Sequence, residues 1–290
     1  MPIFFKILRN GDDFSCTADN GPAFFVGRRV PYEGHIGLYN VFSRSRIERL
    51  NYAAPDFQRP HGFWATLIEP TAICEGLNFL TLNTYDDAAF TFGFGQFAAH
   101  VPNGDFVRYF RALLDLPNAA DYFPHLGVVD GRICQTDGAQ PTPLVGDKTT
   151  QPLMNYLNPG LNEVQDSEVV AAAKFIHWTS SSAEARVAQV TEMVAVFRTY
   201  MSNADVRVSI DGCSGDLCCV IVDILHQGRG GKGTTWPLIH QALKSARPYD
   251  ALLAIGPPKF NSRKTTLKKA IDARPEISAK RWSRAQNDFI

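Results

Sequence analysis

The stretch ICEGLNFLTLNTYDDAAFTFGFGQFAAH occupies residues 73–100 and decides the fold and function expected for the chain. Its first acid, Glu75, lies near the end of an apolar segment with helical spacing. Removing a carboxyl group from water raises its pKa, because burial disfavours the charged form. Asp86 and Asp87 follow in a polar turn, where a carboxylate can stay ionised beside water. The stretch therefore offers one carboxyl group in apolar surroundings and two in polar surroundings.

Carboxyl groups in such contrasting surroundings are what glycoside hydrolysis requires. The leaving oxygen needs a proton from an acid, and the opposite face of the sugar needs a base or a nucleophile. Glu75 is the predicted acid, and Asp86 or Asp87 supplies the second group. The competing interpretation of Glu75 is an acid at a helix end paired with an arginine, because ion-pair networks also place acids at such positions.

A second motif lies in the apolar run at residues 217–227, which predicts a buried helix ended by Gly228. Within it, VDILHQG at 222–228 resembles the Asp-x-x-x-Gln/Asn-x-Gly helix that packs behind the cleft in the lysozyme-like superfamily. The segment DDAAFTFGFGQF at 86–97 resembles the Asp...Thr-x-Gly-x-x-x-Phe pattern of the lysozyme-like chitosanases. Its GFGQF part is similar to the Gly-x-x-Gln segment of goose-type lysozymes and lytic transglycosylases.

The resemblance implies a role for each residue of the site. Glu75 would protonate the glycosidic oxygen, Asp86 would activate water, and Thr91 would hold that water. The gap from Glu75 to the first Asp is shorter than in the chitosanases, so Asp87 stays open as the base, although the register with Thr91 favours Asp86. The remaining residues expected to bind the sugar polymer are Tyr85, Phe92, Phe94, Gln96, His226 and Gln227.

The expected fold is mainly α within the α+β class. The resemblance implies a lysozyme-like, two-lobed helical fold with a small β-hairpin region at the cleft. Turn signals at Asn10-Gly11 and Asn20-Gly21 predict a β-rich lead-in over residues 1–60, followed by a catalytic domain over 61–290. A Pro- and Gly-rich connection at 131–165 separates the two lobes. Besides 217–227, helices are expected over 61–79, 106–116, 167–178, 236–246 and 265–273, with a capped helix beginning near residues 181–184.

Composition narrows the class of protein. The 290 residues carry 29 basic and 29 acidic side chains, and this neutral total argues against nucleic acid as a partner. The zero total arises because a basic segment is balanced by an acidic excess in the rest of the chain. Residues 259–284 hold nine Lys or Arg against two acids, a pattern that suits contact with an anionic surface. No run of about 18 apolar residues predicts a transmembrane segment. The six cysteines lack the spacing of a zinc site, so neither a metal nor a cofactor is expected.

The function expected from these features is a glycosidase that cleaves β-1,4 bonds of an amino-sugar polymer, with peptidoglycan preferred and therefore a muramidase. The alternatives are a chitosanase, a lytic transglycosylase that uses Glu75 alone, and a non-catalytic wall-binding component of a phage or secretion apparatus. The N-terminal residues show no secretory signal. We therefore expect synthesis in the cytoplasm and delivery to the wall by a holin, a phage particle or a secretion system.

Overall fold

The computed structural model describes residues 1–42 and 46–290 and divides the chain into two compact units. Unit 1 contains residues 1–51 and 78–192, and unit 2 contains residues 52–77 and 193–290. The compact units are not the segments 1–60 and 61–290 of the expected domain division, because each unit is built from two separate stretches of chain.

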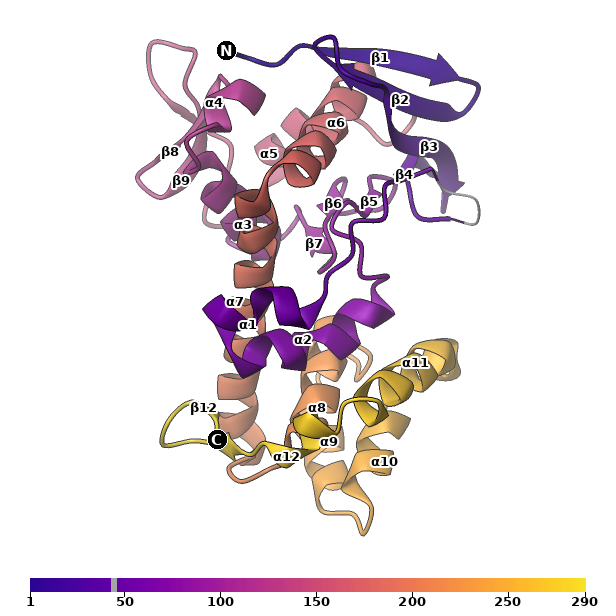
Figure 1. Ribbon diagram of the computed structural model, residues 1–290, viewed down its shortest axis with the longest axis vertical. Helices are drawn as coiled ribbons and strands as arrows, with labels where there is room; N and C mark the ends of the chain where they lie inside the picture. The colour runs from indigo at the N-terminus through magenta and orange to yellow at the C-terminus, as the bar shows by residue number, and fades with distance from the viewer. Residues whose placement is uncertain (43–45) are drawn as a thin grey trace. The chain divides into compact units, whose positions relative to one another are not determined.

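A seven-stranded antiparallel sheet with its strands in chain order is the main β-structure of unit 1 (Figure 1). Its first four strands form a meander, and the Asn10-Gly11 turn joins the first two as predicted, with Gly11 at φ 61°. The bounds are β1 Phe5–Asn10, β2 Asp13–Ala18, β3 Phe24–Tyr32, β4 His35–Tyr39, β5 Leu82–Asn83, β6 Thr91–Phe92 and β7 Phe97–Ala98. Tyr39 pairs with Asn83, and this register joins the meander to the three short strands.

The helices of unit 1 enclose an aromatic core. Phe175 of α6 lies at its centre and contacts the rings of Phe90, Phe92, Phe106 and Phe110 at centroid distances of 5.0–5.6 Å. Helix α6 also packs against β1, β2 and β3. The bounds in this unit are α3 Asp105–Leu114, α4 Ala119–Tyr122, β8 Leu126–Val129, β9 Arg132–Gln135, β10 Thr142–Pro143, α5 Gln151–Leu157, α6 Asp166–Ser181 and the first part of α7 Ala183–Val208.

Unit 2 is built around helix α8, which contacts α2, α9, α10, α11 and α12. Every residue from Cys218 to Ile224 is buried. A second cluster joins Trp64 of α2 to Trp282 and Phe289 in the C-terminal hairpin. The bounds are α1 Ala54–His61, α2 Phe63–Cys74, α8 Gly215–Gln227, α9 Thr235–Leu243, α10 Pro248–Ala254, η1 Pro258–Phe260, α11 Asn261–Asp272, α12 Pro275–Ala279, β11 Trp282–Ser283 and β12 Asp288–Phe289.

The expected mainly α, lysozyme-like fold is wrong. The structure is 46% helical and 17% strand, an α+β fold whose large sheet takes in both the N-terminal strands and the short strands after Glu75. The two β regions were expected separately, as a lead-in and as a small hairpin. Hydrogen bonding between β4 and β5 makes them one sheet, because an edge strand offers unpaired backbone groups to the next strand.

The expected helix positions agree with the structure better than the expected fold class does. The run at 217–227 is α8, and it ends at Gly228 in the left-handed region, φ 68°. Ser182 precedes α7, and its Oγ accepts a hydrogen bond from the Ala185 N–H at 3.1 Å, which confirms the expected cap. The helix expected over 61–79 is shorter, because α2 ends at Cys74.

Candidate functional site

Glu75 follows the last residue of α2, at the helix C-cap. Gly76 and Leu77 come next with φ of 93° and 64°, so the chain turns away sharply after the carboxyl group. The Glu75 side chain is 16% exposed, which leaves it largely buried but within reach of solvent. The end of the helix therefore fixes the position of a partly buried acid.

Two cationic or titratable groups from unit 2 approach this carboxyl group. The Oε1 atom of Glu75 accepts a hydrogen bond from Arg263 Nη1 at 2.7 Å, and His226 Nε2 lies 3.6 Å from the same oxygen. Arg263 comes from α11 and His226 from the last turn of α8. The arginine partner that the competing interpretation of Glu75 required is therefore present.

Arg263 is held in turn by Asp223 of α8, which is completely buried. Arg263 Nη2 donates to Asp223 Oδ1 at 2.7 Å, and Arg229 Nη1 donates to the other oxygen, Oδ2. Arg229 Nε also donates to the carbonyl of Ile255 at 3.2 Å. Glu75, Asp223, Arg229 and Arg263 thus form a charge cluster that pairs two carboxylates with two guanidinium groups.

Burial and the neighbouring carboxylates act in opposite directions on the two arginines of the charge cluster. Burial alone would lower the pKa of Arg263, but the carboxylates of Asp223 and Glu75 outweigh it and raise that pKa above its usual value. Burial lowers the pKa of Arg229, and Asp223 opposes this shift. Because Arg263 is shared between two carboxylates, its charge does not act on Glu75 alone.

Asp86 and Asp87 lie in the connection between β5 and β6 of unit 1, and their surroundings differ. Asp86 is half-buried, and its Oδ1 accepts a hydrogen bond from the Ala88 N–H at 3.1 Å. Burial raises the pKa of Asp86, although that hydrogen bond opposes the shift. The Asp87 side chain is 99% exposed and lies 3.9 Å from His35 Nδ1. Asp86 is therefore more desolvated than the polar turn suggested.

The predicted residues Thr91, Gln96 and Tyr85 make their contacts with other residues of unit 1. Thr91 is 5% exposed and pairs with Asn83 and Ala98 across β6. Gln96 adopts φ 52°, and its Nε2 donates to the carbonyl of Gly93 at 2.9 Å, which closes the turn between β6 and β7. The ring of Tyr85 packs against Tyr32 and Tyr39, and burial raises the pKa of Tyr85 to about 12.

Phe92 and Phe94 do not have the exposed rings expected of sugar-stacking residues. Both side chains are 0% exposed. Phe92 packs on Phe175 at 5.4 Å and Phe94 on Phe79 at 5.0 Å, so the aromatic core covers them. The sequence could not show which rings face inward. This prediction is corrected: both rings stabilise the fold.

The predicted residues fall into two groups. Glu75, His226 and Gln227 belong to unit 2, while the group from Tyr85 to Gln96 belongs to unit 1. His226 is close to Glu75, as described above, and its ring also contacts Phe197 at 5.9 Å. Gln227 is the last residue of α8 and is partly exposed. The sequence reasoning missed Arg229 and Arg263, and Asp223 was noted only as part of a motif.

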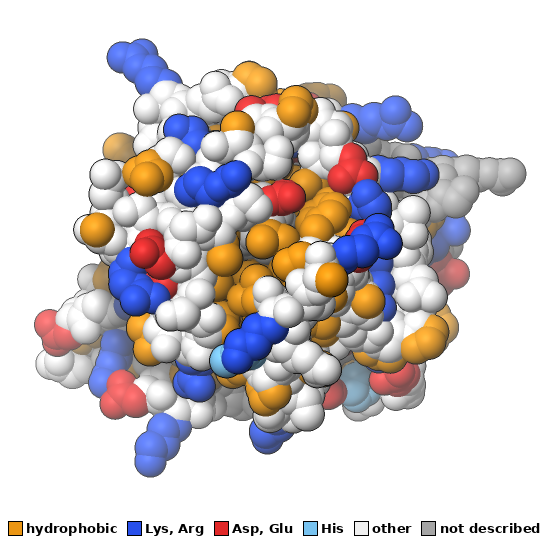
Figure 2. All heavy atoms as spheres, turned by 90° about the horizontal axis from the view of Figure 1, so that it is seen from below, with side chains coloured by type: hydrophobic (Ala, Val, Ile, Leu, Met, Phe, Trp, Pro, Cys, Tyr) orange, Lys and Arg blue, Asp and Glu red, His pale blue; other side chains and the backbone are white. Residues whose placement is uncertain are grey.

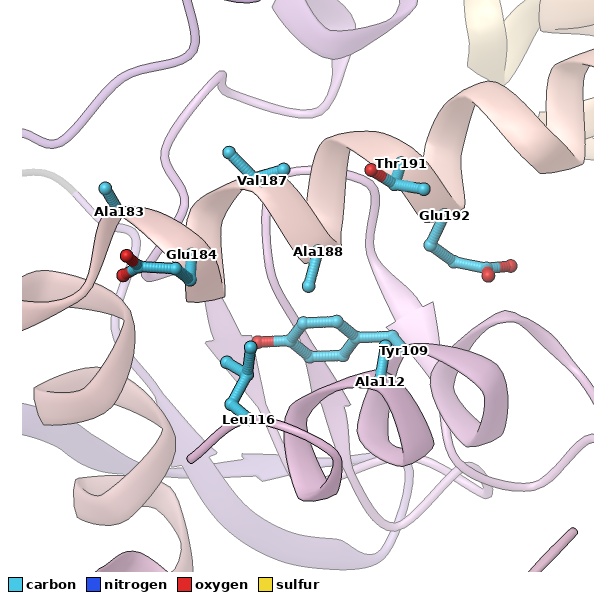
Figure 3. A pocket seen from close by; sticks show the side chains of 9 residues that line it. All are labelled: Tyr109, Ala112, Leu116, Ala183, Glu184, Val187, Ala188, Thr191 and Glu192. Atoms are coloured by element: carbon cyan, nitrogen blue, oxygen red, sulfur yellow. The ribbon is translucent and has the colours of Figure 1, made fainter. Parts of the chain in front are cut away.

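A groove of about 500 Å³ lies between α3 and α7 in unit 1, and its nine lining residues include none of the predicted site residues (Figure 3). The Tyr109 ring and Leu116 face Ala188, while Glu184 and Glu192 project at either end. Arg108 Nη2 pairs with Glu192 Oε1 at 2.5 Å. The lining residues are Tyr109, Ala112, Leu116, Ala183, Glu184, Val187, Ala188, Thr191 and Glu192.

Comparison with known proteins gives no significant match to any family model, curated protein or solved structure. Within residues 1–42 and 46–290, no group of three or more His, Cys, Asp or Glu side chains is placed to hold a metal ion. In the same part of the chain, none of the helices combines the length and apolar character needed to cross a bilayer.

Proposed function

We propose that the protein is a glycoside hydrolase that acts on an amino-sugar polymer, with Glu75 as its proton donor. The observation that carries the proposal is the way Glu75 is held. Its Oε1 accepts the hydrogen bond from Arg263, whereas its Oε2 has no hydrogen-bond partner within the described residues. A carboxyl group fixed through one oxygen, with the other open and the side chain 16% exposed, is oriented to deliver a proton.

The charge cluster supplies the rigidity that such a donor needs. Asp223 is fully buried and accepts from Arg263 Nη2, while Glu75 accepts from Nη1, so the guanidinium group is held through two of its nitrogens. Groups held by buried ion pairs lose little orientational freedom when the reaction begins, and preorganisation of this kind lowers the barrier. Arg263 and Asp223 act here as positioning residues.

Asp86 keeps its proposed role as the second carboxyl group. A general base is more effective in catalysis when its pKa lies near the working pH. Burial raises the pKa of Asp86 in that direction. Asp87 is fully exposed, so the burial of Asp86 favours Asp86 of the two. Single substitutions test Glu75 and Asp86 independently.

The proposal is tested by incubating the purified protein with peptidoglycan sacculi and, separately, with chitosan, and by identifying the products by mass spectrometry. We expect Glu75→Gln to lower turnover at least about 100-fold with the circular dichroism spectrum unchanged. Glu276→Gln, at an exposed acid of α12 in the same unit, is the matched control and should keep full activity. Full activity of Glu75→Gln, or no product from either polymer, would overturn the proposal.

The products also separate the chemical alternatives. A reducing sugar end indicates hydrolysis, and a 1,6-anhydro end indicates the lytic transglycosylase reaction with Glu75 alone. Release from sacculi only indicates a muramidase, the substrate class that we prefer, and release from chitosan only indicates a chitosanase. Binding to sacculi without products would indicate the non-catalytic alternative.

The basic segment 259–284 is proposed to contact an anionic wall or membrane surface. Its exposed cations include Lys259, Lys269 and Arg281. On the face seen from below, Lys and Arg side chains lie around a central group of hydrophobic side chains (Figure 2). Screening weakens such contacts, so retention on sacculi should fall as salt rises from low to physiological ionic strength. Retention that is independent of salt would contradict this part of the proposal.

A further inference from the structure

A second cavity, of about 600 Å³, lies in unit 1 beside α6. Its walls come from strands β2 and β3 with their connecting turn, the segment 46–48, Leu80 and one face of α6. The lining residues are Ser15, Ala18, Gly21, Pro22, Ala23, Phe24, Phe25, Arg46, Ile47, Glu48, Leu80, Ile176, His177 and Ser180. This α6 cavity shares no residue with the proposed catalytic groups.

The walls of the α6 cavity combine apolar and polar surface in similar proportions. Phe25, Leu80 and Ile176 are buried, and Phe24 is half-buried with its ring 5.6 Å from that of His177. Ligand pockets of this size are usually lined by apolar side chains with a few polar groups that fix orientation. The α6 cavity is more polar than this, so charged and polar groups should contribute more to ligand binding there.

Its polar groups are held in place by specific contacts. Ser180 Oγ donates to Glu48 Oε2 at 2.7 Å, and the Glu48 carbonyl accepts a hydrogen bond from Asn78 Nδ2 at 2.8 Å. The Nδ1 atom of His177 lies 3.0 Å from the Tyr122 hydroxyl, which orients the imidazole ring. Burial lowers the pKa of His177, so the ring is neutral at pH 7.

One acidic and one basic residue line the cavity, Glu48 and Arg46, which are both exposed and lie two residues apart on the same segment. A ligand that satisfies both must carry a cation and an anion close together. A guanidinium group binds a carboxylate through paired N–H donors, and a carboxylate accepts hydrogen bonds from an ammonium group. An α-amino acid has both groups on one carbon.

We propose that the α6 cavity binds a free α-amino acid with an apolar side chain. Its carboxylate meets Arg46, its ammonium group meets Glu48, and its side chain packs against Phe24, Phe25 and Ile176. A sugar fits less well, because Phe25 is only 7% exposed and the ring of Phe24 is paired with His177, so neither offers an open face for stacking. The inference concerns a site separate from the proposed glycosidase function.

The test is isothermal titration calorimetry of the full chain with L-leucine and L-phenylalanine. Two analogues of leucine separate the charged contacts: 4-methylpentanoate lacks the ammonium group, and 3-methylbutylamine lacks the carboxylate. Loss of one charged contact should weaken binding about tenfold or more. We expect Arg46→Met to weaken binding of L-leucine and 4-methylpentanoate but not that of the amine, and Glu48→Gln to show the reverse pattern with the two analogues.

Matched controls are Arg49→Met and Glu163→Gln, at exposed residues that do not line the cavity. Both should bind L-leucine like the unchanged protein, and thermal unfolding should show that all four variants are folded. The proposal is overturned if neither amino acid binds at millimolar concentration, if the control variants weaken binding equally, or if a neutral methyl glycoside binds in place of the amino acids.

Discussion

Asp223 in unit 2 and Glu168 in unit 1 are both completely buried acids, and the chain surrounds them in different ways. Asp223 is paired with the guanidinium groups of Arg229 and Arg263. Glu168, in the first turn of α6, receives neutral donors from the described residues, among them the Thr84 hydroxyl at 2.5 Å and the Gln165 N–H at 3.3 Å. Burial raises the pKa of Glu168 to about 7, because these donors offset only part of the desolvation.

The difference shows what a partner's charge does for a buried carboxyl group. Two guanidinium groups satisfy the buried Asp223, and one of them also holds Glu75 in place. Neutral donors leave Glu168 able to gain a proton near neutral pH. Unit 2 should therefore depend on its ion partners, whereas unit 1 should carry a stability that changes with pH.

The largest effect is expected from Arg263→Met, which removes the guanidinium group shared by Asp223 and Glu75. Breaking a buried ion pair leaves uncompensated charge in the interior and typically costs about 3–5 kcal/mol. Urea-induced unfolding should show this loss as a lower midpoint. The matched control is Arg247→Met, whose partner is Asp250 and whose side chain is 81% exposed. Equal midpoints for the two variants would contradict the role given to the charge cluster.

The next effect is a pH dependence caused by Glu168. Below pH 4.5 this group is protonated in both the folded and unfolded states and has no net effect. As pH rises toward 7, the unfolded chain loses the proton first, so the free energy of unfolding falls. The rise in the pKa of Glu168 from 4.5 to about 7 corresponds to roughly 3 kcal/mol of stability. This contribution is lost once the pH exceeds the folded-state pKa.

Glu168→Gln isolates this effect, because glutamine does not ionise. The difference in the free energy of unfolding between the unchanged protein and this variant should fall by about 3 kcal/mol across the same pH window, measured by urea titration at a series of pH values. Glu163→Gln changes an exposed acid just before α6 and should leave the pH profile unaltered. A Glu168→Gln profile parallel to that of the unchanged protein would show that Glu168 is not the cause.

A smaller effect is expected from Thr84→Val. The Thr84 hydroxyl donates to Glu168 and accepts a hydrogen bond from the Leu38 N–H at 2.6 Å. Valine therefore leaves the Glu168 carboxyl group and the Leu38 N–H without this hydrogen-bond partner. The expected cost is about 1–3 kcal/mol. Loss of a donor to the carboxylate should also move the pH-dependent fall in stability to higher pH. Thr142→Val, at an exposed position of β10, should neither lower the free energy of unfolding nor shift its pH dependence.

Sequence reasoning predicted the local elements of this fold better than their assembly. Turn chemistry at Asn10-Gly11 and the left-handed Gly228 act over a few residues, so both could be recognised in the sequence. Strands β5, β6 and β7 have two residues each, too short to show the alternation that identifies a strand. Their place in the large sheet depends on the pairing of Tyr39 with Asn83, which no local pattern records.

The candidate site shows the same limit. An apolar segment followed by Glu75 was visible, and the acid does lie at the end of α2. Its partner Arg263 lies 188 residues further along the chain, in a basic segment that suggested only a charged surface. Asp166 and Glu168 both occupy the first turn of α6, yet the first is exposed and the second buried. Which acid faces inward depends on β4 and β5, and the sequence of α6 alone does not contain that information.

The smallest effect is expected from Lys268→Met, on the same helix as Arg263. Lys268 Nζ lies 2.6 Å from Asp272 Oδ2, slightly closer than Arg263 lies to either of its acids, but its side chain is 47% exposed. Water screens this pair, so its loss should cost below about 1 kcal/mol and less at high salt. The ammonium group also lies 5.3 Å from the Tyr249 ring, a contact that salt weakens less. If Lys268→Met cost as much as Arg263→Met in urea, contact distance rather than burial would set the strength of ion pairs on α11.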